Sequence, residues 1–251
     1  MKALNKMNKQ RMAVRGLFII AIAIGSIFSC NVEVADNSIT STEELLRAMK
    51  KENDGKWFQN FTFKQRTYRY SESEELIDST IWHEFVHYPS YFRIDRDIDN
   101  KHYTIYRNDS TYNFRNDSLI QAADQPAVHL LYKGGLYFMS LEESLEKLDK
   151  YGYDKNVFMQ EVFNGEPVYS VGDSTMQFKV HADHFYCMNR TYTTNSGKRV
   201  VATYDNFKRL KNGWVEQTVT FEVDGVKRLY EEYYDIKSPD KLNMELFDIR
   251  D

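Results

Sequence analysis

Alternation of side chains from Trp57 onward restricts this chain to a largely antiparallel β fold. Along residues 57–66, one set of alternate positions carries Trp57, Phe61 and Phe63, and the intervening set is mostly polar. Because successive side chains of a strand point to opposite faces, this period of two predicts a strand with one buried face. Similar stretches rich in Tyr, Phe, Ile and Thr predict a meander that continues through residues 79–88, 91–97, 102–107 and 110–115.

A second group of strands occupies the C-terminal half of the chain. Its turns carry strong signals, such as Asn212-Gly213 and Asp224-Gly225, because Asn, Asp and Gly tolerate the positive φ of tight hairpins. We expect a two-residue hairpin between Val223 and Val226. The last strands are long, so the sheet must curve or twist strongly. The strands of this group are expected at residues 166–171, 175–181, 184–192, 199–210, 213–223 and 226–236.

Two helices are expected from capping boxes, in which a serine is followed three residues later by a glutamate. Ser41 and Glu44 begin one through about residue 53, and Ser140 and Glu143 begin another through about residue 151. Residues 154–163 could add a further short turn of helix. No repeat or linker divides the pattern, so we predict an α+β fold with a strongly curved antiparallel sheet of about 10–11 strands in one domain, residues 41–251.

Residues 1–29 have the features of a bacterial export signal. Five basic residues precede a short apolar run at 17–24, which is too short to cross a bilayer, and small residues follow. Cys30 closes the run 27–30, which resembles a lipobox, so we expect lipidation at Cys30 and a tether over residues 30–40. Ordinary secretion with a free cysteine is the alternative.

Charge excludes one class of partner. Five of the 33 basic residues and none of the 37 acidic ones lie in residues 1–29, so the rest of the chain has a net charge of about −9. Nucleic-acid binding needs a basic face, and electrostatic adhesion to anionic lipid needs one too. Membrane attachment is therefore expected through acyl chains on Cys30. Cys187, left without a partner, is expected to be a small buried hydrophobe.

His83, Glu84 and His87 match the H-E-x-x-H pattern of zinc hydrolases, which requires a helix. The β-branched and aromatic residues around the motif, and Pro89 just after it, favour a strand instead. On a strand the two histidines lie about 13 Å apart, too far to share one zinc ion. His181 and His184 form a second conceivable cluster, but polar turn residues are the simpler interpretation. We expect no metal, no cofactor and no enzymatic activity.

The aromatic residues at alternate strand positions have two interpretations. They could fill the core by cross-strand packing. Alternatively, a curved sheet covered by only two helices could leave an apolar cavity that takes a lipid or acyl chain.

The chain resembles the LolA/LolB-like outer-membrane lipoprotein-sorting proteins over about residues 41–249. The resemblance is carried by Trp82 and Glu84 leading into the Pro89 turn and the strand that ends Arg93-Ile94-Asp95. It is also carried by residues 165–171, 178–180, 204–207, 212–213, 234–236 and 246–247. It implies a half-open barrel with helices covering its concave side, a non-catalytic carrier of lipid, and an anchor like that of LolB-like members.

Together these observations predict a lipoprotein of the outer membrane, anchored at Cys30 and facing the periplasm or the cell surface. Its ligand would be an acyl chain or a lipoprotein lipid. The alternative is an accessory or scaffold lipoprotein that contacts another envelope protein; a zinc hydrolase is a third. Alternation assigns the ligand-binding residues as Phe61, Phe63, Trp82, Val86, Phe92, Ile94, Ile105, Val219 and Phe221.

Overall fold

The computed structural model describes residues 39–99 and 101–249. The expected signal peptide, the lipidation site Cys30 and most of the tether lie outside the described residues.

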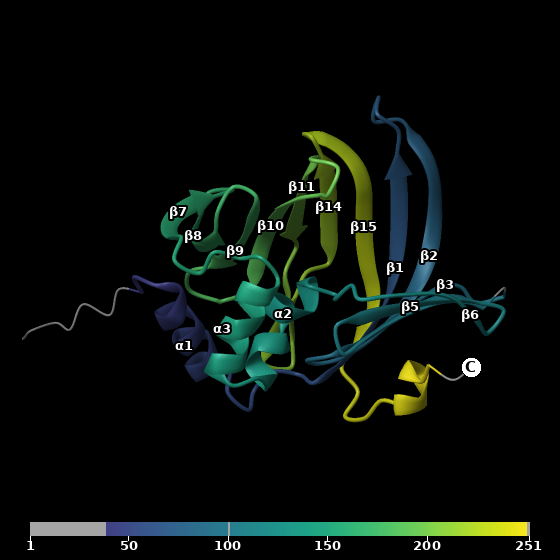
Figure 1. Cartoon of the computed structure of the whole chain (residues 1–251), viewed down its shortest axis with the longest axis horizontal. Coiled ribbons are helices and arrows are strands. Elements are labelled where there is room, and N and C mark those ends of the chain that lie inside the picture. Colours follow the sequence, from purple (N-terminus) through teal and green to yellow (C-terminus); the bar gives the residue numbers. More distant parts are fainter. Residues whose placement is uncertain (1–38, 100, 250–251) are drawn as a thin grey trace, which may run out of the picture. The chain divides into compact units, whose positions relative to one another are not determined.

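One open antiparallel sheet dominates the described part of the chain, where it contains 13 strands. Its order is β6-β5-β4-β3-β2-β1-β15-β14-β11-β10-β9-β8-β7, so β1 and β15 join an N-terminal and a C-terminal group of strands (Figure 1). A separate two-stranded ribbon, β12-β13, interrupts the second group. The bounds are β1 (Asn60–Tyr70), β2 (Leu76–His87), β3 (Tyr91–Asp97), β4 (His102–Arg107), β5 (Ser110–Arg115), β6 (Ser118–Ala123), β7 (Phe158–Phe163), β8 (Glu166–Gly172), β9 (Met176–His181), β10 (Cys187–Thr193), β11 (Arg199–Asp205), β12 (Lys208–Leu210), β13 (Gly213–Val215), β14 (Thr218–Val223) and β15 (Val226–Lys237).

The helices begin where the sequence places their caps. In α1 (Thr42–Asn53) the Ser41 side chain accepts a hydrogen bond from the backbone N–H of Glu44, at 3.2 Å. In α3 (Leu141–Lys150) both bonds of the capping box between Ser140 and Glu143 form. Two short elements, α2 (His129–Lys133) and the 3₁₀ turn η1 (Gly135–Phe138), lie between the two groups of strands, and a second 3₁₀ turn, η2 (Met244–Phe247), follows β15.

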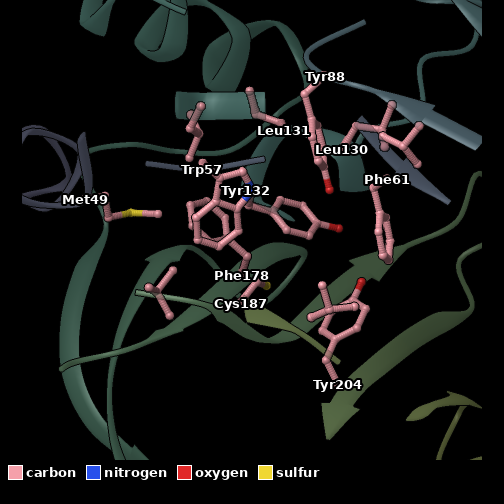
Figure 2. Close-up of a cluster of buried hydrophobic side chains, with 14 of the residues drawn as sticks. Met49, Trp57, Phe61, Tyr88, Leu130, Leu131, Tyr132, Phe178, Cys187 and Tyr204 are labelled. Atoms are coloured by element: carbon pink, nitrogen blue, oxygen red, sulfur yellow. The ribbon is translucent and has the colours of Figure 1, made fainter. Parts of the chain in front are cut away.

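The two faces of the sheet carry separate cores. Buried side chains of α1, α2 and α3, including Leu46, Leu131 and Leu148, form one cluster with Phe61 and Phe178 of the sheet. Figure 2 shows part of it. A smaller cluster joins residues of β4, β5 and η2, namely Ile105, Phe114 and Phe247.

Four strand predictions required correction. Residues 158–163 form β7 and not a helix, and β6 was not expected. Both are edge strands, and most of their side chains are exposed, so burial imposes no clear alternation on them. The strands expected at 199–210 and 213–223 are each divided, near Asn206 and Gln217, and Asn206 has a φ of 56° that breaks the extended backbone. The expected Asp224-Gly225 hairpin is confirmed, because Val223 pairs with Val226.

Substitution of Gly172, at the end of β8, would test how tightly the backbone is packed there. Its φ is +97°, and a Cβ atom would lie 2.0 Å from the carbonyl oxygen of Met176. We expect Gly172→Ala to lower the free energy of unfolding by about 2–3 kcal/mol, because strain and a backbone clash add. Gly197→Ala is the matched control: its φ is +80°, but the Cβ would have nothing within 4 Å, so only about 1 kcal/mol should be lost. Equal losses in a urea titration would contradict the clash.

Candidate functional site

A cavity of about 130 Å³ lies between α2 and the sheet. Its wall combines apolar side chains of the strands with residues of α2. In Figure 2 the hydroxyl ends of Tyr88 and Tyr204 and the ring of Phe61 point toward one region, near Leu130 of α2, and all four residues line the cavity. The wall consists of Phe61, Phe63, Gln65, Trp82, Glu84, Val86, Tyr88, Phe92, Ile94, His129, Leu130, Lys133, Arg190, Tyr204, Phe221, Glu231 and Tyr233.

Strand register explains why these side chains meet. Residues directly opposite each other in neighbouring antiparallel strands point to the same face. Across β1 and β2 the pairs Phe61↔Val86, Phe63↔Glu84 and Gln65↔Trp82 all contribute to the wall. The same face continues into β3 through Phe92 and Ile94, and into β15 through Tyr233, whose ring centre lies 4.4 Å from that of Phe63.

Ionisable groups interrupt the apolar wall. Lys133 of α2 forms a buried ion pair with Glu216, and its Nζ lies 5.2 Å from the ring centre of Tyr204. Glu84 and Glu231 are 4% and 7% exposed. Burial, together with the Glu231 carboxyl, raises the pKa of Glu84 well above its usual range.

Two side-chain donors favour the charged form of Glu231, Tyr233 most and Gln65 less. The Tyr233 hydroxyl donates to Glu231 Oε2 at 3.0 Å. Burial outweighs this bond and raises the pKa of Glu231 to about 7. The cavity therefore offers apolar contact area together with two buried carboxyls, each of which holds its proton more tightly than an exposed glutamate does.

No protein-family model matches the chain, and no curated protein matches it in sequence. Solved structures resemble it at low identity. A DUF1329 family protein from Desulfovibrio piger has a TM-score of 0.56 at 10% identity, over 83% of this chain and 96% of that one. A LolA superfamily protein from Nitrosomonas europaea has a TM-score of 0.55 at 12% identity, over 84% and 98%. A putative outer membrane lipoprotein-sorting protein domain from Vibrio parahaemolyticus has a TM-score of 0.56 at 12% identity, over 83% and 96%.

The fold is LolA-like. These comparisons confirm the resemblance at the level of the fold, since identities of 10–12% carry no more than that. No helix within residues 39–99 and 101–249 is long and apolar enough to span a bilayer.

Seven of the nine side chains that alternation assigned to ligand binding line the cavity of the LolA-like sheet; they are Phe61, Phe63, Trp82, Val86, Phe92, Ile94 and Phe221.

Two of the nine do not line it. Val219 is fully buried in the main core cluster. Ile105 pairs with Arg93, whereas Thr104 pairs with Ile94, so the register turns Ile105 to the opposite face of the sheet, toward Phe247. The assignment of Ile105 to the cavity face is wrong.

Sequence reasoning missed the two buried carboxyls. From the sequence, Glu84 is placed in the H-E-x-x-H motif and in the family resemblance, but not among the cavity residues, and Glu231 is given no role. The signal was present for Glu84, because it lies between Trp82 and Val86 at a spacing of two and must share their face.

The H-E-x-x-H motif lies within β2, which confirms the expected strand. His83 and His87 therefore lie on the face opposite Glu84, spaced along a strand and not across one turn of a helix. A ring nitrogen of His87 is instead 2.7 Å from Asn60 Oδ1. In the described part of the chain, no group of three or more His, Cys, Asp or Glu residues is arranged to hold a metal ion.

The remaining candidates have structural roles. His181 Nδ1 accepts hydrogen bonds from the backbone N–H groups of Asp183 and His184, at 3.1 and 3.3 Å, so it holds the turn after β9. Cys187 is a buried free thiol whose pKa burial raises. Neither arrangement suggests catalysis.

Proposed function

We propose that this protein is a lipid-anchored lipoprotein of the bacterial envelope that binds an acyl chain or a lipoprotein lipid and transfers it without catalysis. The apolar cavity of about 130 Å³ under α2 supports this most directly. In this proposal residues 1–29 are the signal peptide, Cys30 carries the acyl chains and residues 30–40 are the tether. Residues 41–251 form a half-barrel that faces the periplasm or the cell surface and needs no cofactor.

The size of the cavity limits what it holds in this conformation. Its volume is close to that of an apolar cavity of about 150 Å³ that was engineered in another protein and admits benzene. The cavity can therefore take a short section of an acyl chain. Each buried methylene contributes about 0.8 kcal/mol. A longer section requires the cavity to widen. Such widening would displace α2, which has only five residues and no side-chain N-cap, and would cost part of the buried contacts of Leu131 and Tyr132.

Filling the cavity should weaken the binding of an acyl chain. Val86 is 3% exposed and lines the wall, so Val86→Trp would occupy the space of a ligand. We expect the affinity for a fluorescent fatty-acid analogue to fall by at least about tenfold, the loss of roughly two buried methylenes. The measurement is a fluorescence titration of delipidated protein.

Val162→Trp is the matched control, because Val162 is 70% exposed on β7. Circular dichroism should show that both variants are folded. If the parent protein neither retains lipid in native mass spectrometry nor binds the analogue, the carrier proposal fails.

An accessory role is the second candidate, and the two edges of the sheet favour it. Leu119 and Ile120 on β6, and Met159 and Val162 on β7, are 40–70% exposed. Unpaired edge strands with exposed apolar side chains are natural sites for pairing with another chain. Cross-linking of an envelope protein at these edges, by a protein free of bound lipid, would favour this role.

A further inference from the structure

The cavity contains an acidic feature that an acyl chain alone does not explain. Glu84 and Glu231 lie on β2 and β15, among the aromatic residues of the wall. Glu84 is only 4% exposed. Placing a carboxylate in apolar surroundings is costly unless a hydrogen bond or a cation compensates.

Glu84 lacks such a partner within the chain. No hydrogen bond or ion pair to its carboxyl forms among residues 39–99 and 101–249, whereas Glu231 interacts with two side-chain donors, Tyr233 and Gln65. Two nearby cations, Lys133 and Arg96, act on Glu84 through space, but neither forms an ion pair with it. Lys133 pairs with Glu216, and the Arg96 guanidinium donates a hydrogen bond to Thr104. The Glu84 carboxyl therefore faces a largely apolar cavity without a direct partner of its own.

We propose, resting on the proposed function, that the ligand is an amphiphile with a primary ammonium group, which Glu84 and Glu231 hold while its chain lies against Phe61, Phe63 and Phe92. An ammonium group has three N–H donors and can bond to both carboxylates. The aromatic faces of the wall also attract a cation. In their ionised form the same two groups would repel a ligand with a carboxylate or another anionic head.

Proton release accompanies binding. Burial raises the pKa of both carboxyls, so without a ligand each holds its proton longer than an exposed glutamate does. A cation favours the charged form, so its entry transfers these protons to solvent. Five ionisable groups lie around the pair: Lys133 and His129 of α2, Arg190 of β10, Arg96 of β3, and Glu216. The first three line the cavity, and Lys133, Arg96 and Glu216 act on one carboxyl or both. Affinity for the ammonium ligand should increase as pH rises through about 7.

The test compares dodecylamine, dodecanol and dodecanoate, which share one chain and differ in the head group. Binding to the full-length purified protein is followed by intrinsic fluorescence, to which Trp82 of the wall contributes. If detergent is needed to keep the full-length protein in solution, each probe partitions into it to the same extent for every variant, so this partition does not affect the comparison between variants. We expect dodecylamine to bind at least about tenfold more tightly than dodecanol, the range of a charge-assisted hydrogen bond, and dodecanoate to bind most weakly.

Glu84→Gln keeps the shape of the side chain and removes its charge. It should remove most of the preference for dodecylamine, leave dodecanol binding nearly unchanged, and reduce the protons released in calorimetry. Glu231→Gln should act in the same direction. Glu142→Gln, on the exposed surface of α3, is the control and should change nothing.

The outcomes separate the two proposals. If dodecanol binds but dodecylamine binds no better, or if Glu84→Gln keeps the preference, the ammonium ligand is excluded and the carrier role stands. If none of the three probes binds, the carrier role fails as well.

Discussion

Replacing Lys133 with methionine is expected to lower the free energy of unfolding by about 3–5 kcal/mol, the cost of leaving one partner of a buried ion pair alone. The side chains of Lys133 and Glu216 are 13% and 7% exposed. Glu216 lies among Trp57, Tyr132 and Trp214, which cannot neutralise a carboxylate. Methionine keeps the length and apolar stem of lysine, so the change isolates the charge. Equilibrium unfolding in urea measures it.

Two further variants make the result specific. In Lys133→Met with Glu216→Leu both charges are gone, and stability should return to within about 1 kcal/mol of the parent, since apolar groups can replace a buried pair. Lys211→Met removes a surface bridge to Asp240, whose side chain is 96% exposed, and should have no measurable effect. A Lys133→Met protein as stable as Lys211→Met would mean that water reaches Glu216.

Local signals were sufficient for much of the fold. The serines at positions 41 and 140 identified the starts of α1 and α3, because a cap is decided within four residues. The bounds of β3, β4 and β5 follow the sequence closely, since each strand alternates and ends at a polar turn. The edge strands β6 and β7 lack one consistently buried face, so the pattern that reveals a strand is weak there.

The site was harder to predict because it depends on register and on distant contacts. Alternation within a strand groups its residues into two faces but does not say which face meets the cavity. In β2 the aromatic residue Trp82 and the apolar Val86 identified the inner face, whereas in β4 the most apolar residue, Ile105, packs on a second core built with η2. The role of Lys133 depends on α2, which brings it to Glu216, 83 positions later in the chain, and no local pattern contains that contact.

Glu231 should make the protein less stable as pH rises toward neutrality. Its pKa is 4.5 in its ordinary state and about 7 in the folded protein, so the folded state binds the proton more tightly than the unfolded state does. The stabilising contribution of Glu231 is then fully present below about 4.5, is lost between 4.5 and about 7, and does not change above that range. Since one pKa unit corresponds to about 1.4 kcal/mol, the fall due to Glu231 is about 3 kcal/mol. Glu84 acts in the same direction, so the parent protein should lose more than this.

Unfolding measured across this pH range in the parent and in Glu231→Gln separates the contribution of Glu231. Glutamine has no proton to lose, so the variant should be the more stable protein above about 7 and should show a shallower fall between 4.5 and that pH. Glu142→Gln, exposed on α3, should retain the parent's profile. A profile in which parent stability rises toward neutral pH would show that a cation already neutralises Glu231 in the folded protein. A cationic ligand would then gain little from Glu231. The expected fall in stability would instead show that ionising the buried Glu231 costs free energy, which a bound cation could offset.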